Sequence, residues 1–417
     1  MSQEGCREEL ELIFAGVDWA ETHHDVYVQD EHGQKLASGR LPEGVQGIAR
    51  FHELAGAHAG EPGQVVIGIE TDRGLFVNAL AAAGYLVFAV NPMSASRYRD
   101  RHSVSGAKSD PGDAKVLADL VRTDRHNHRP AATDSDQVLA VRALARAHQS
   151  MIWSRRRQAN QLRSALREFY PAALAAFDDL TSGEAIAVLK AAPRPDRGAA
   201  LSRTQVTAAL RRGGRARRLP ERTAAVQAAL RSPQLAPAPG LAAAMGATVA
   251  AMAAVIGEMN TQIAALEREL SAGFEQHPDA EVVRSLPGLG TILGARVLSE
   301  FGDAPDRYPT AKSRKNYAGT SPITRASGSK RAVLARHVRN RRLADAIYLW
   351  AFAAITASPG ARTFYDQHRA AGATHHAALR ALGNRLVGIL HGCLTHHTSY
   401  DENTAWAHRS CQPATAA

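Results

Sequence analysis

The stretch Leu12-Ile13-Phe14-Ala15-Gly16-Val17-Asp18 is an apolar run that ends on a carboxylate. Residues 64–70 repeat this arrangement and end on Glu70, and a third apolar run over 85–90 stops before a proline. Short apolar runs bounded by turn signals predict buried strands. The alternation of polar and apolar residues over 25–29 predicts a half-buried strand beside them. Together with helical sequence between the runs, this pattern predicts an α/β domain with a mixed sheet.

Length and composition restrict the class of protein. A chain of 417 residues exceeds one ordinary hydrophobic core, so we expect two or three domains. Apolar residues make up 45% and charged residues 22%, which is typical of a soluble globular protein and gives no support to a largely disordered chain. The net charge of +10 favours a nucleic-acid partner, although a basic surface without a polyanion partner stays possible. The excess charge lies mainly in the arginine clusters 155–157, 215–218 and 339–342.

The cysteines and the first residues of the chain indicate the expected cellular compartment. Cys6, Cys393 and Cys411 are far apart and form no paired spacing, which argues against a zinc site or a disulfide framework and favours a reducing cytoplasm. The first twelve residues are acidic and polar, unlike a signal peptide. We identify no run of about 18 uncharged apolar residues, so a membrane span is not expected.

The middle and end of the chain are predicted to be mainly helical. Apolar residues recur at helical spacing over 135–176 and 241–274, which predicts two long amphipathic helices in a coiled-coil hairpin. Residues 193–239 are rich in Pro, Gly, Ala and Arg and are expected to form a partly mobile tip with short helices. From residue 279 we expect a further helical domain, followed by a loose polar tail from 403.

Four carboxylates are candidate metal ligands. Asp18 and Glu70 end two apolar runs, while Asp110 and Asp113 lie three apart at the start of a helix and therefore share a face. Four such charges in one pocket would repel without a cation, and Mg²⁺ prefers oxygen ligands. Two ions about 4 Å apart can activate an attacking oxygen and stabilise a leaving oxygen in phosphoryl transfer. Alternatively, these residues cap a helix, complement its dipole and terminate strands.

A glycine turn precedes the candidate serine. Residues 286–291 read Leu-Pro-Gly-Leu-Gly-Thr between two helical runs, as in a helix-hairpin-helix turn. The N–H groups of Gly288 and Gly290 could then approach a nucleic-acid phosphate at a helix start. A loop that merely joins core helices is the alternative.

Ser327 precedes a glycine and is flanked by Arg325, Lys330 and Arg331, which are candidate phosphate contacts. A nucleophilic serine needs this exposure near a phosphate, although an inert loop serine fits the sequence too.

The chain resembles the DEDD insertion-sequence transposases, whose first domain is similar to the RuvC Holliday-junction resolvases. The loop after Glu70 differs from the Glu-Ala-Thr-Gly that members often carry, so Asp72 is an alternative ligand. Four ordered segments carry the resemblance: Phe14-Ala15-Gly16-Val17-Asp18, Gly68-Ile69-Glu70-Thr71, Asn91-Pro92 and Lys108-Ser109-Asp110-Pro111-Gly112-Asp113-Ala114.

A second motif set resembles the other conserved domain of the same transposases. Pro-Gly-Leu-Gly, Tyr-Ala-Gly, Ser-Pro and Ser-Gly follow one another and precede a predicted basic helix. The family's Ser-Gly serine is catalytic, and Ser327 matches it, with Ser329 and Ser321 as alternatives. The resemblance covers about residues 12–125 and 282–355. The arginine-rich insert and the tail histidines, interpreted as surface or packing residues, are not explained by it.

The resemblance implies an RNase H-like (RuvC-like) α/β domain, a helical coiled-coil middle and a mainly helical transposase domain with a helix-hairpin-helix turn. It implies DNA strand exchange through a transient phosphoserine at Ser327, with Mg²⁺ on the tetrad and Mn²⁺ as a substitute. It also implies dimers and a tetramer with sites shared between subunits, a structured noncoding guide RNA, and a bacterial, nucleoid-associated location. The predicted domains are 1–130 (catalytic), 131–278 (coiled coil and oligomerisation, with the arginine-rich insert), 279–402 (serine-containing) and 403–417 (flexible tail).

Two other functions fit part of the sequence. A metal-dependent Holliday-junction nuclease would use the tetrad and leave Ser327 inert. A non-catalytic basic coiled-coil protein would only bind nucleic acid. The serine-containing segment argues against the first, and acidic residues at all four matched positions argue against the second.

Overall fold

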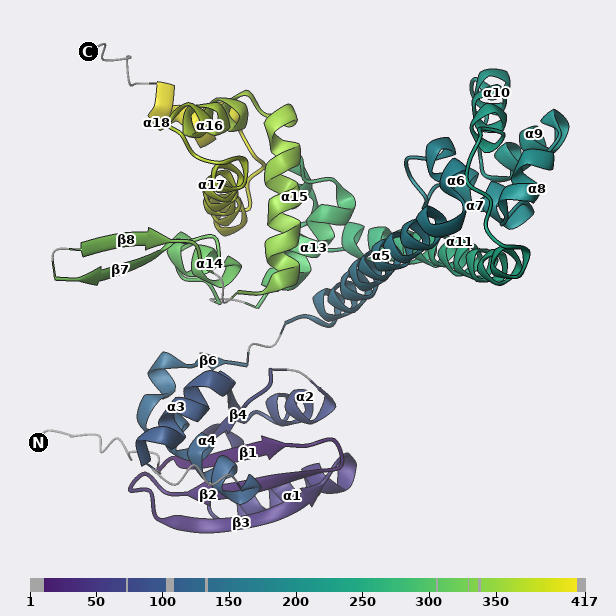
Figure 1. Cartoon of the computed structure of the whole chain (residues 1–417). Helices are drawn as coiled ribbons and strands as arrows, with labels where there is room; N and C mark the ends of the chain where they lie inside the picture. The colour runs from purple at the N-terminus through teal and green to yellow at the C-terminus, as the bar shows by residue number, and fades with distance from the viewer. Residues whose placement is uncertain are drawn as a thin grey trace, which may run out of the picture. The chain divides into compact units, whose positions relative to one another are not determined.

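The computed structural model describes residues 11–72, 74–102, 109–131, 134–304, 307–328, 330–336 and 339–410. Of the residues named above, Cys6, Lys108, Ser329 and Cys411 lie outside these ranges. The chain divides into two compact units, residues 1–134 and 135–417, which are described separately (Figure 1).

The first unit contains a six-stranded mixed sheet in the order β3-β2-β1-β4-β5-β6. Strands β1, β4 and β5 are parallel, while β2 and β3 extend one edge as antiparallel strands and β6 pairs antiparallel with β5. This confirms the predicted mixed α/β class. The strands are β1 (Ile13–Trp19), β2 (His23–Gln29), β3 (Lys35–Pro42), β4 (Val65–Ile69), β5 (Leu86–Ala89) and β6 (Arg129–Pro130).

Helices cover both faces of this sheet. Alternate residues of β1 enter different cores: Ile13, Ala15 and Val17 pack in the core with α1 and α2, whereas Phe14 packs with α3 and α4. The two-residue period of a strand therefore places Gly16 and Asp18 on the α4 face. The helical elements are α1 (Val45–Gly56), η1 (Pro62–Gln64), α2 (Leu75–Ala82), α3 (Pro92–His102), α4 (Asp110–Asp124) and η2 (Arg125–Asn127).

The second unit is built on two long helices, α5 (Asp136–Phe169) and α11 (Pro239–Glu275), which pack along each other. One end of each contributes to a core with the C-terminal helices, and the other end contributes to a separate core in a helical lobe. The helix predicted over 135–176 is interrupted at Pro171, because proline lacks the N–H group that a continuous helix requires.

The lobe is a packed structure, which corrects the expectation of a partly mobile tip. Val206, Leu210, Val226 and Leu230 recur at helical spacing and are fully or almost fully buried against α11 and the neighbouring helices. These apolar stripes form a core of their own despite the surrounding Pro, Gly and Arg. The lobe helices are α6 (Pro171–Ala176), α7 (Gly183–Ala191), α8 (Pro195–Ala200), α9 (Arg203–Arg212) and α10 (Leu219–Leu230).

The C-terminal part packs around Trp350, which is fully buried. It contains one hairpin, β7 (Ile323–Ser327) and β8 (Lys330–Leu334), which extends from α14 in Figure 1. Residues 323–327 and 330–334 therefore form strands within the segment expected to be mainly helical. β-branched residues on both strands and Gly328 at φ 55° favour a hairpin instead. The predicted basic helix after the Ser-Gly corresponds to α15 (Arg341–Ala357), which begins with two arginines. The helices are α12 (Ala280–Ser285), α13 (Thr291–Phe301), α14 (Ala311–Ala318), α15 (Arg341–Ala357), α16 (Pro359–Ala370), α17 (His375–His396) and α18 (Glu402–Ser410).

The tail expected to be loose from residue 403 is helical through Ser410, so that expectation is wrong for α18. Trp406 anchors this helix: it is 8% exposed, packs against Phe364 and donates a hydrogen bond to the Tyr400 hydroxyl at 2.9 Å. A buried indole supplies enough apolar contact to fix a short terminal helix.

Helix α11 also corrects the expectation that no long apolar run exists. By length and composition this one helix among the described residues is apolar enough to cross a membrane. In this fold α11 packs along α5 and against α7.

Candidate active site

Asp18 and Glu70 lie at neighbouring ends of parallel strands. In the β1–β4 ladder Val17 pairs with Ile69, so the next residue on each strand is one of these two carboxylates. Both side chains are partly buried. The carboxyl ends of parallel strands share one sheet edge, so Asp18 and Glu70 occupy adjacent positions there.

Helix α4 crosses this edge with its N-terminus toward Asp18. The Arg125 guanidinium, just beyond the C-terminal end of α4, lies 5.6 Å from the Phe14 ring centre, whereas a Cβ at Gly16 would collide with the Ala114 carbonyl. The helix therefore runs opposite to β1.

A similar close approach occurs at the neighbouring strand, where a Cβ at Gly68 would lie 2.6 Å from the Leu117 carbonyl oxygen. Asp110 and Asp113 lie one turn before Ala114 and Leu117, on the side toward Asp18 and Glu70. The two glycines thus allow the carboxylates of α4 to approach the strand ends.

The structure adds two residues that the sequence analysis did not identify, His23 and Asp25. Their ligand atoms and that of Asp110 lie within 4.8 Å of one another. Asp25 is 6% exposed and pairs directly with Asp18 across the β1–β2 ladder. Among the described residues, Asp110 is in this cluster, whereas the other three predicted carboxylates, Asp18, Glu70 and Asp113, are not part of it.

The signal for Asp25 was present in the sequence. Both it and Asp18 belong to predicted strands separated by a short connection, so a hairpin could bring them together. The pairing depends on the hairpin register, which the strand pattern alone leaves open.

Two arginines compensate the carboxylates. Arg40 donates to both oxygens of Asp25 at 2.9 and 3.2 Å and lies 3.8 Å from Asp110. Its hydrogen bond to Asp25 raises the pKa of Arg40 above the ordinary value, more than its slight desolvation lowers it. The buried Asp113 forms an ion pair with Arg99 of α3. Both carboxylates in the first turn of α4, Asp110 and Asp113, therefore have cationic neighbours.

This donor set fits a divalent cation. Carboxylate oxygens dominate, which suits a hard ion such as Mg²⁺. His23 adds an imidazole nitrogen within reach of Asp25 and Asp110, and Mn²⁺ accepts nitrogen more readily than Mg²⁺ does. Asp72 is exposed two residues beyond Glu70 and is not part of the His23 cluster found among the described residues.

Ser327 is exposed at the end of β7, in the second unit. It pairs across the hairpin with Lys330, and Arg325 two residues earlier shares its face. Arg331 pairs with Ala326 and faces the other side. Ser327 is therefore accessible and has two cationic neighbours on its face.

Ser321 and Ser329 are the two alternatives to Ser327. Ser321 is partly buried and lies before β7, where its carbonyl oxygen accepts a hydrogen bond from Arg336 at 3.4 Å. Ser329 lies outside the described residues.

The glycine turn joins α12 and α13. A Cβ at Gly288, whose φ is 79°, would lie 2.6 Å from the backbone nitrogen of Ala354, and Trp350 donates a hydrogen bond to the Pro287 carbonyl at 2.9 Å. Gly288 thus packs against α15. Gly290 is the N-cap of α13, and a Cβ added there would have no neighbouring atom within 4 Å. The turn is therefore open at Gly290 and closed by α15 at Gly288.

Comparison with known proteins gives a consistent result. A DEDD transposase model, described as a transposase, matches residues 15–171, and a model described as the IS116/IS110/IS902 transposase family matches 280–366. The Streptomyces coelicolor protein assigned as the mini-circle transposase of IS117 is 44% identical over 405 residues, covering 96% of this chain and 98% of that protein.

Two further relatives are more distant. The uncharacterized 42 kDa protein of IS900 from Mycobacterium paratuberculosis is 28% identical, covering 95% of this chain and 98% of its own length. The uncharacterized 43.6 kDa protein of IS110 from Streptomyces coelicolor is also 28% identical, covering 93% and 95%.

Proposed function

The chain belongs to the IS110 family of DEDD transposases, and from that membership we propose that it cuts and rejoins DNA with a metal-binding carboxylate site and a serine nucleophile. The observation that carries the proposal is the pairing of Val17 with Ile69, which gives Asp18 and Glu70 adjacent strand ends beneath the first turn of α4.

Asp18, Glu70, Asp110 and Asp113 are the proposed metal ligands. Carboxylates from two strand ends and one helical turn suit Mg²⁺, and Mn²⁺ can replace it. When bound, a pair of such ions would supply positive charge to the attacking and leaving oxygens of phosphoryl transfer. The chain's own contribution is to hold the carboxylates together. Arg40 lies 3.8 Å from Asp110, and Arg99 forms an ion pair with Asp113.

Ser327 is the proposed nucleophile. Its hydroxyl oxygen attacks a DNA phosphorus, an O–P bond forms, and the bond from phosphorus to one strand oxygen breaks. The serine proton is lost and the departing oxygen gains one, which leaves a phosphoserine link and a free hydroxyl end. Attack by the hydroxyl end of another strand then restores Ser327 and joins the strands. Arg325 and Lys330 would hold the phosphate, because they lie on the same hairpin face as Ser327.

The wider organisation is proposed from family membership. Residues 1–130 would carry the metal site, 131–278 self-association through α5 and α11, and 279–402 the serine. Dimers and a tetramer would let Ser327 of one copy complete the metal site of another. A structured noncoding RNA is the proposed guide, and Gly290 is the more accessible backbone donor for a phosphate.

The decisive experiment is to trap a covalent protein–DNA adduct with donor and target duplexes, Mg²⁺ and the noncoding RNA encoded beside the gene. Wild-type protein should form an adduct that survives denaturing electrophoresis, and Ser327→Ala should form none and recombine no DNA. Ser321→Ala and Ser329→Ala are the matched controls and should behave as wild type. Recombination by Ser327→Ala at the wild-type rate would overturn the serine assignment, and cleavage without any adduct would favour the junction nuclease.

A further inference from the structure

The lobe α6–α10 lies almost wholly between the two segments that the family models match, 15–171 and 280–366. Its most basic part is the turn from α9 to α10 and the first helical turns of α10, residues 211–222, which we call the arginine turn. The arginine turn contains six arginines and one glutamate. With Glu184 of α7, which contacts it, the formal charge is six minus two, or +4.

Two of these arginines have a structural role. Glu184 is largely buried and accepts from Arg215 at 3.1 Å and from Arg222 at 3.0 Å. Arg215 also donates to the carbonyl of Arg217 at 2.8 Å. These contacts fix the backbone of the turn on α7.

A close backbone contact with the same start of α7 also holds this turn. A Cβ at Gly213 would lie 2.4 Å from the Gly183 carbonyl oxygen, so the start of α7 and the end of α9 touch without side chains between them. The arginine turn is therefore held rigidly, which lowers the entropy lost when its side chains bind a partner.

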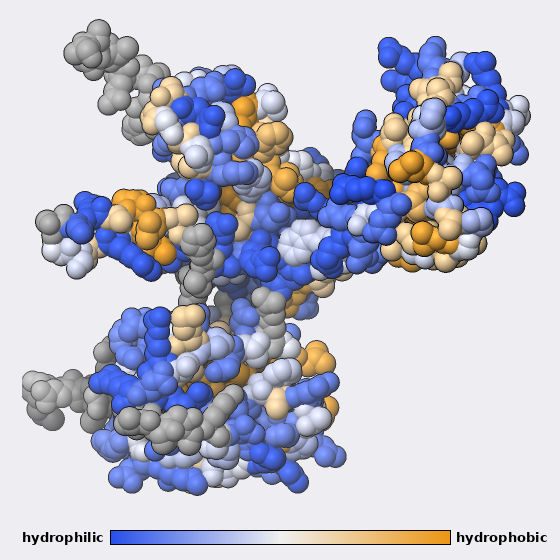
Figure 2. All heavy atoms as spheres, viewed as in Figure 1, coloured by the Kyte–Doolittle hydropathy of each residue, from blue (hydrophilic) through white to orange (hydrophobic). Residues whose placement is uncertain are grey.

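The other four arginines, Arg211, Arg212, Arg217 and Arg218, are exposed. Within the described ranges, none of the ion pairs involves them. In Figure 2 hydrophilic and hydrophobic residues are mixed on the face of the lobe that is turned to the viewer. Arg211 and Arg212 also complement the dipole at the C-terminus of α9, which accounts for two of the four but not for Arg217 or Arg218.

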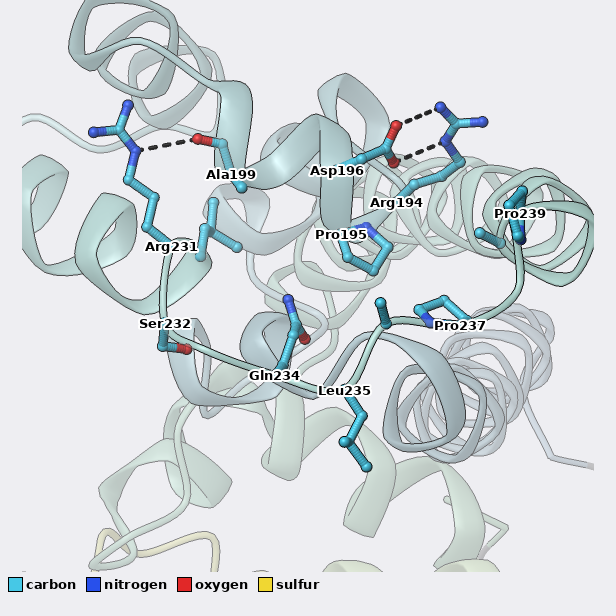
Figure 3. Close-up of a pocket in the computed structure, with 13 residues that line it drawn as sticks. Arg194, Pro195, Asp196, Ala199, Arg231, Ser232, Gln234, Leu235, Pro237 and Pro239 are labelled. Atoms are coloured by element: carbon cyan, nitrogen blue, oxygen red, sulfur yellow. Dashed lines mark hydrogen bonds and ion pairs between the residues drawn. The ribbon is translucent and has the colours of Figure 1, made fainter.

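The opposite part of the lobe provides a contrast. There Arg194 pairs with Asp196 at 2.6 Å, and Arg231 donates to the Ala199 carbonyl at 3.1 Å, around the pocket shown in Figure 3. The arginines of that pocket are already engaged within the protein. Elsewhere in the lobe, Arg197 and Arg203 are also exposed and take part in no ion pair among the described residues, so the arginine turn carries four of the six such arginines within residues 171–230.

We propose that the arginine turn binds the phosphate backbone of a double-stranded nucleic acid. Guanidinium groups match phosphate oxygens in a two-point geometry, and four of them on a fixed turn can contact successive phosphates. Residues 211–222 contain no aromatic side chain on which an unpaired base could stack, so backbone contact is favoured over single-strand readout. Binding at this surface is sequence-independent and positions the duplex.

The test measures binding by the full chain, without cleavage, so its result is separate from that of the proposed chemistry. Fluorescence anisotropy would follow random-sequence 30-base-pair DNA and RNA duplexes over a series of salt concentrations. The variant replaces Arg211, Arg212, Arg217 and Arg218 with Gln. It should weaken binding at least about tenfold and make the negative slope of log K against log salt shallower by about 2 to 4, since each lost phosphate contact contributes about 0.9 to its magnitude.

Two controls keep the result interpretable. The same four positions changed to Lys should retain most of the affinity and show that the turn is intact. Gln at four exposed arginines elsewhere, Arg50, Arg268, Arg369 and Arg380, removes the same charge and should change binding less than about threefold. A loss with one duplex only would assign the phosphate source to DNA or RNA. An unchanged salt slope in the arginine-turn variant, or an equal loss in the scattered variant, would overturn the proposal.

Discussion

Asp18 and Asp25 face each other as directly paired residues of β1 and β2. Residues that are opposite in an antiparallel ladder project to the same face of the sheet. The face that carries the predicted tetrad therefore carries a fifth carboxylate, which contacts Arg40 and lies near His23 and Asp110.

Replacing Asp25 tests whether this fifth carboxylate supports metal binding. Asp25→Asn removes its charge and frees Arg40, so we expect divalent-metal affinity to fall about tenfold, the scale of losing a group that positions metal ligands. Isothermal titration with Mn²⁺ measures it. Asp100→Asn, at an exposed position on α3, is the control. Equal affinities in both variants would remove Asp25 from the site.

Arg40 is expected to have the opposite effect. Its guanidinium shares Asp25 and Asp110 with any incoming cation, so Arg40→Gln should bind Mn²⁺ about two- to fivefold more tightly, the scale of an exposed ion pair. Arg40→Lys keeps the charge and should remain near wild type. Weaker Mn²⁺ binding by Arg40→Gln would mean that the arginine organises the ligands instead of competing for them.

The tetrad itself is tested by single Ala substitutions at Asp18, Glu70, Asp110 and Asp113. Each should reduce DNA strand cleavage by more than about a hundredfold, because losing a ligand costs at least as much as losing its supporting contact. Duplex binding should be largely kept, since it depends on Lys and Arg contacts to phosphates. Cleavage assays and anisotropy on the same protein separate the two effects, and wild-type cleavage by any one variant would exclude that residue.

Glu300 links three helices in the serine-containing part. It accepts from Arg146 of α5 at 2.6 and 2.8 Å and from Asn340 at 2.7 Å. Burial alone would raise the pKa of Glu300, but the hydrogen bonds and charge of Arg146, with smaller effects of Asn340 and Arg142, outweigh it, so the pKa lies below its ordinary value.

The lowered pKa gives the sign of a pH effect. Stability from this group is fully present above the unfolded-state pKa, near about 4.3, and is lost as pH falls through the lower folded-state pKa. Glu300→Gln should lower the free energy of unfolding by about 3 kcal/mol at pH 7, because it removes the buried carboxylate charge that pairs with the partly buried Arg146. Denaturant unfolding at pH 7 and pH 3 measures it, and a variant penalty that does not shrink at the lower pH would contradict the assignment.

Self-association is tested on the exposed face of α11. Val255 is 45% exposed on this helix, which makes it a candidate contact between copies. Val255→Glu should weaken dimerisation at least about tenfold, since a charge at an apolar contact is costly, while leaving the fold intact. Light scattering over a concentration series reports the mass. Gln262→Glu, at another exposed position, controls for the added charge, and unchanged dimers in Val255→Glu would place assembly elsewhere.

Strands and helices with regular apolar spacing were predictable from the sequence, whereas contacts between residues of different elements were not. The strands over 12–18 and 64–70 and the helices α5 and α11 follow from regular apolar spacing. His23 and Asp25 were missed because their contact with Asp110 depends on hairpin register and helix placement, which local spacing does not determine.

Local composition misled where tertiary contacts decide the outcome. The segment over 193–239 has the composition of a mobile loop, yet buried Leu and Val at helical spacing hold it in a lobe. The end of the chain is polar, but a single buried residue, Trp406, holds α18 in place. In both cases a few apolar side chains outweigh the average character of their segment.

Gly16 has a consequence for which mutations the enzyme can tolerate. Because the Ala114 carbonyl occupies the space that any side chain would need, even alanine at position 16 would push α4 away from β1. A genetic screen for inactive variants should therefore recover substitutions of this chemically inert residue as often as substitutions of the carboxylates. Among related sequences, the glycine should be as invariant as Asp18, although it has no side chain that could bind a metal ion or DNA.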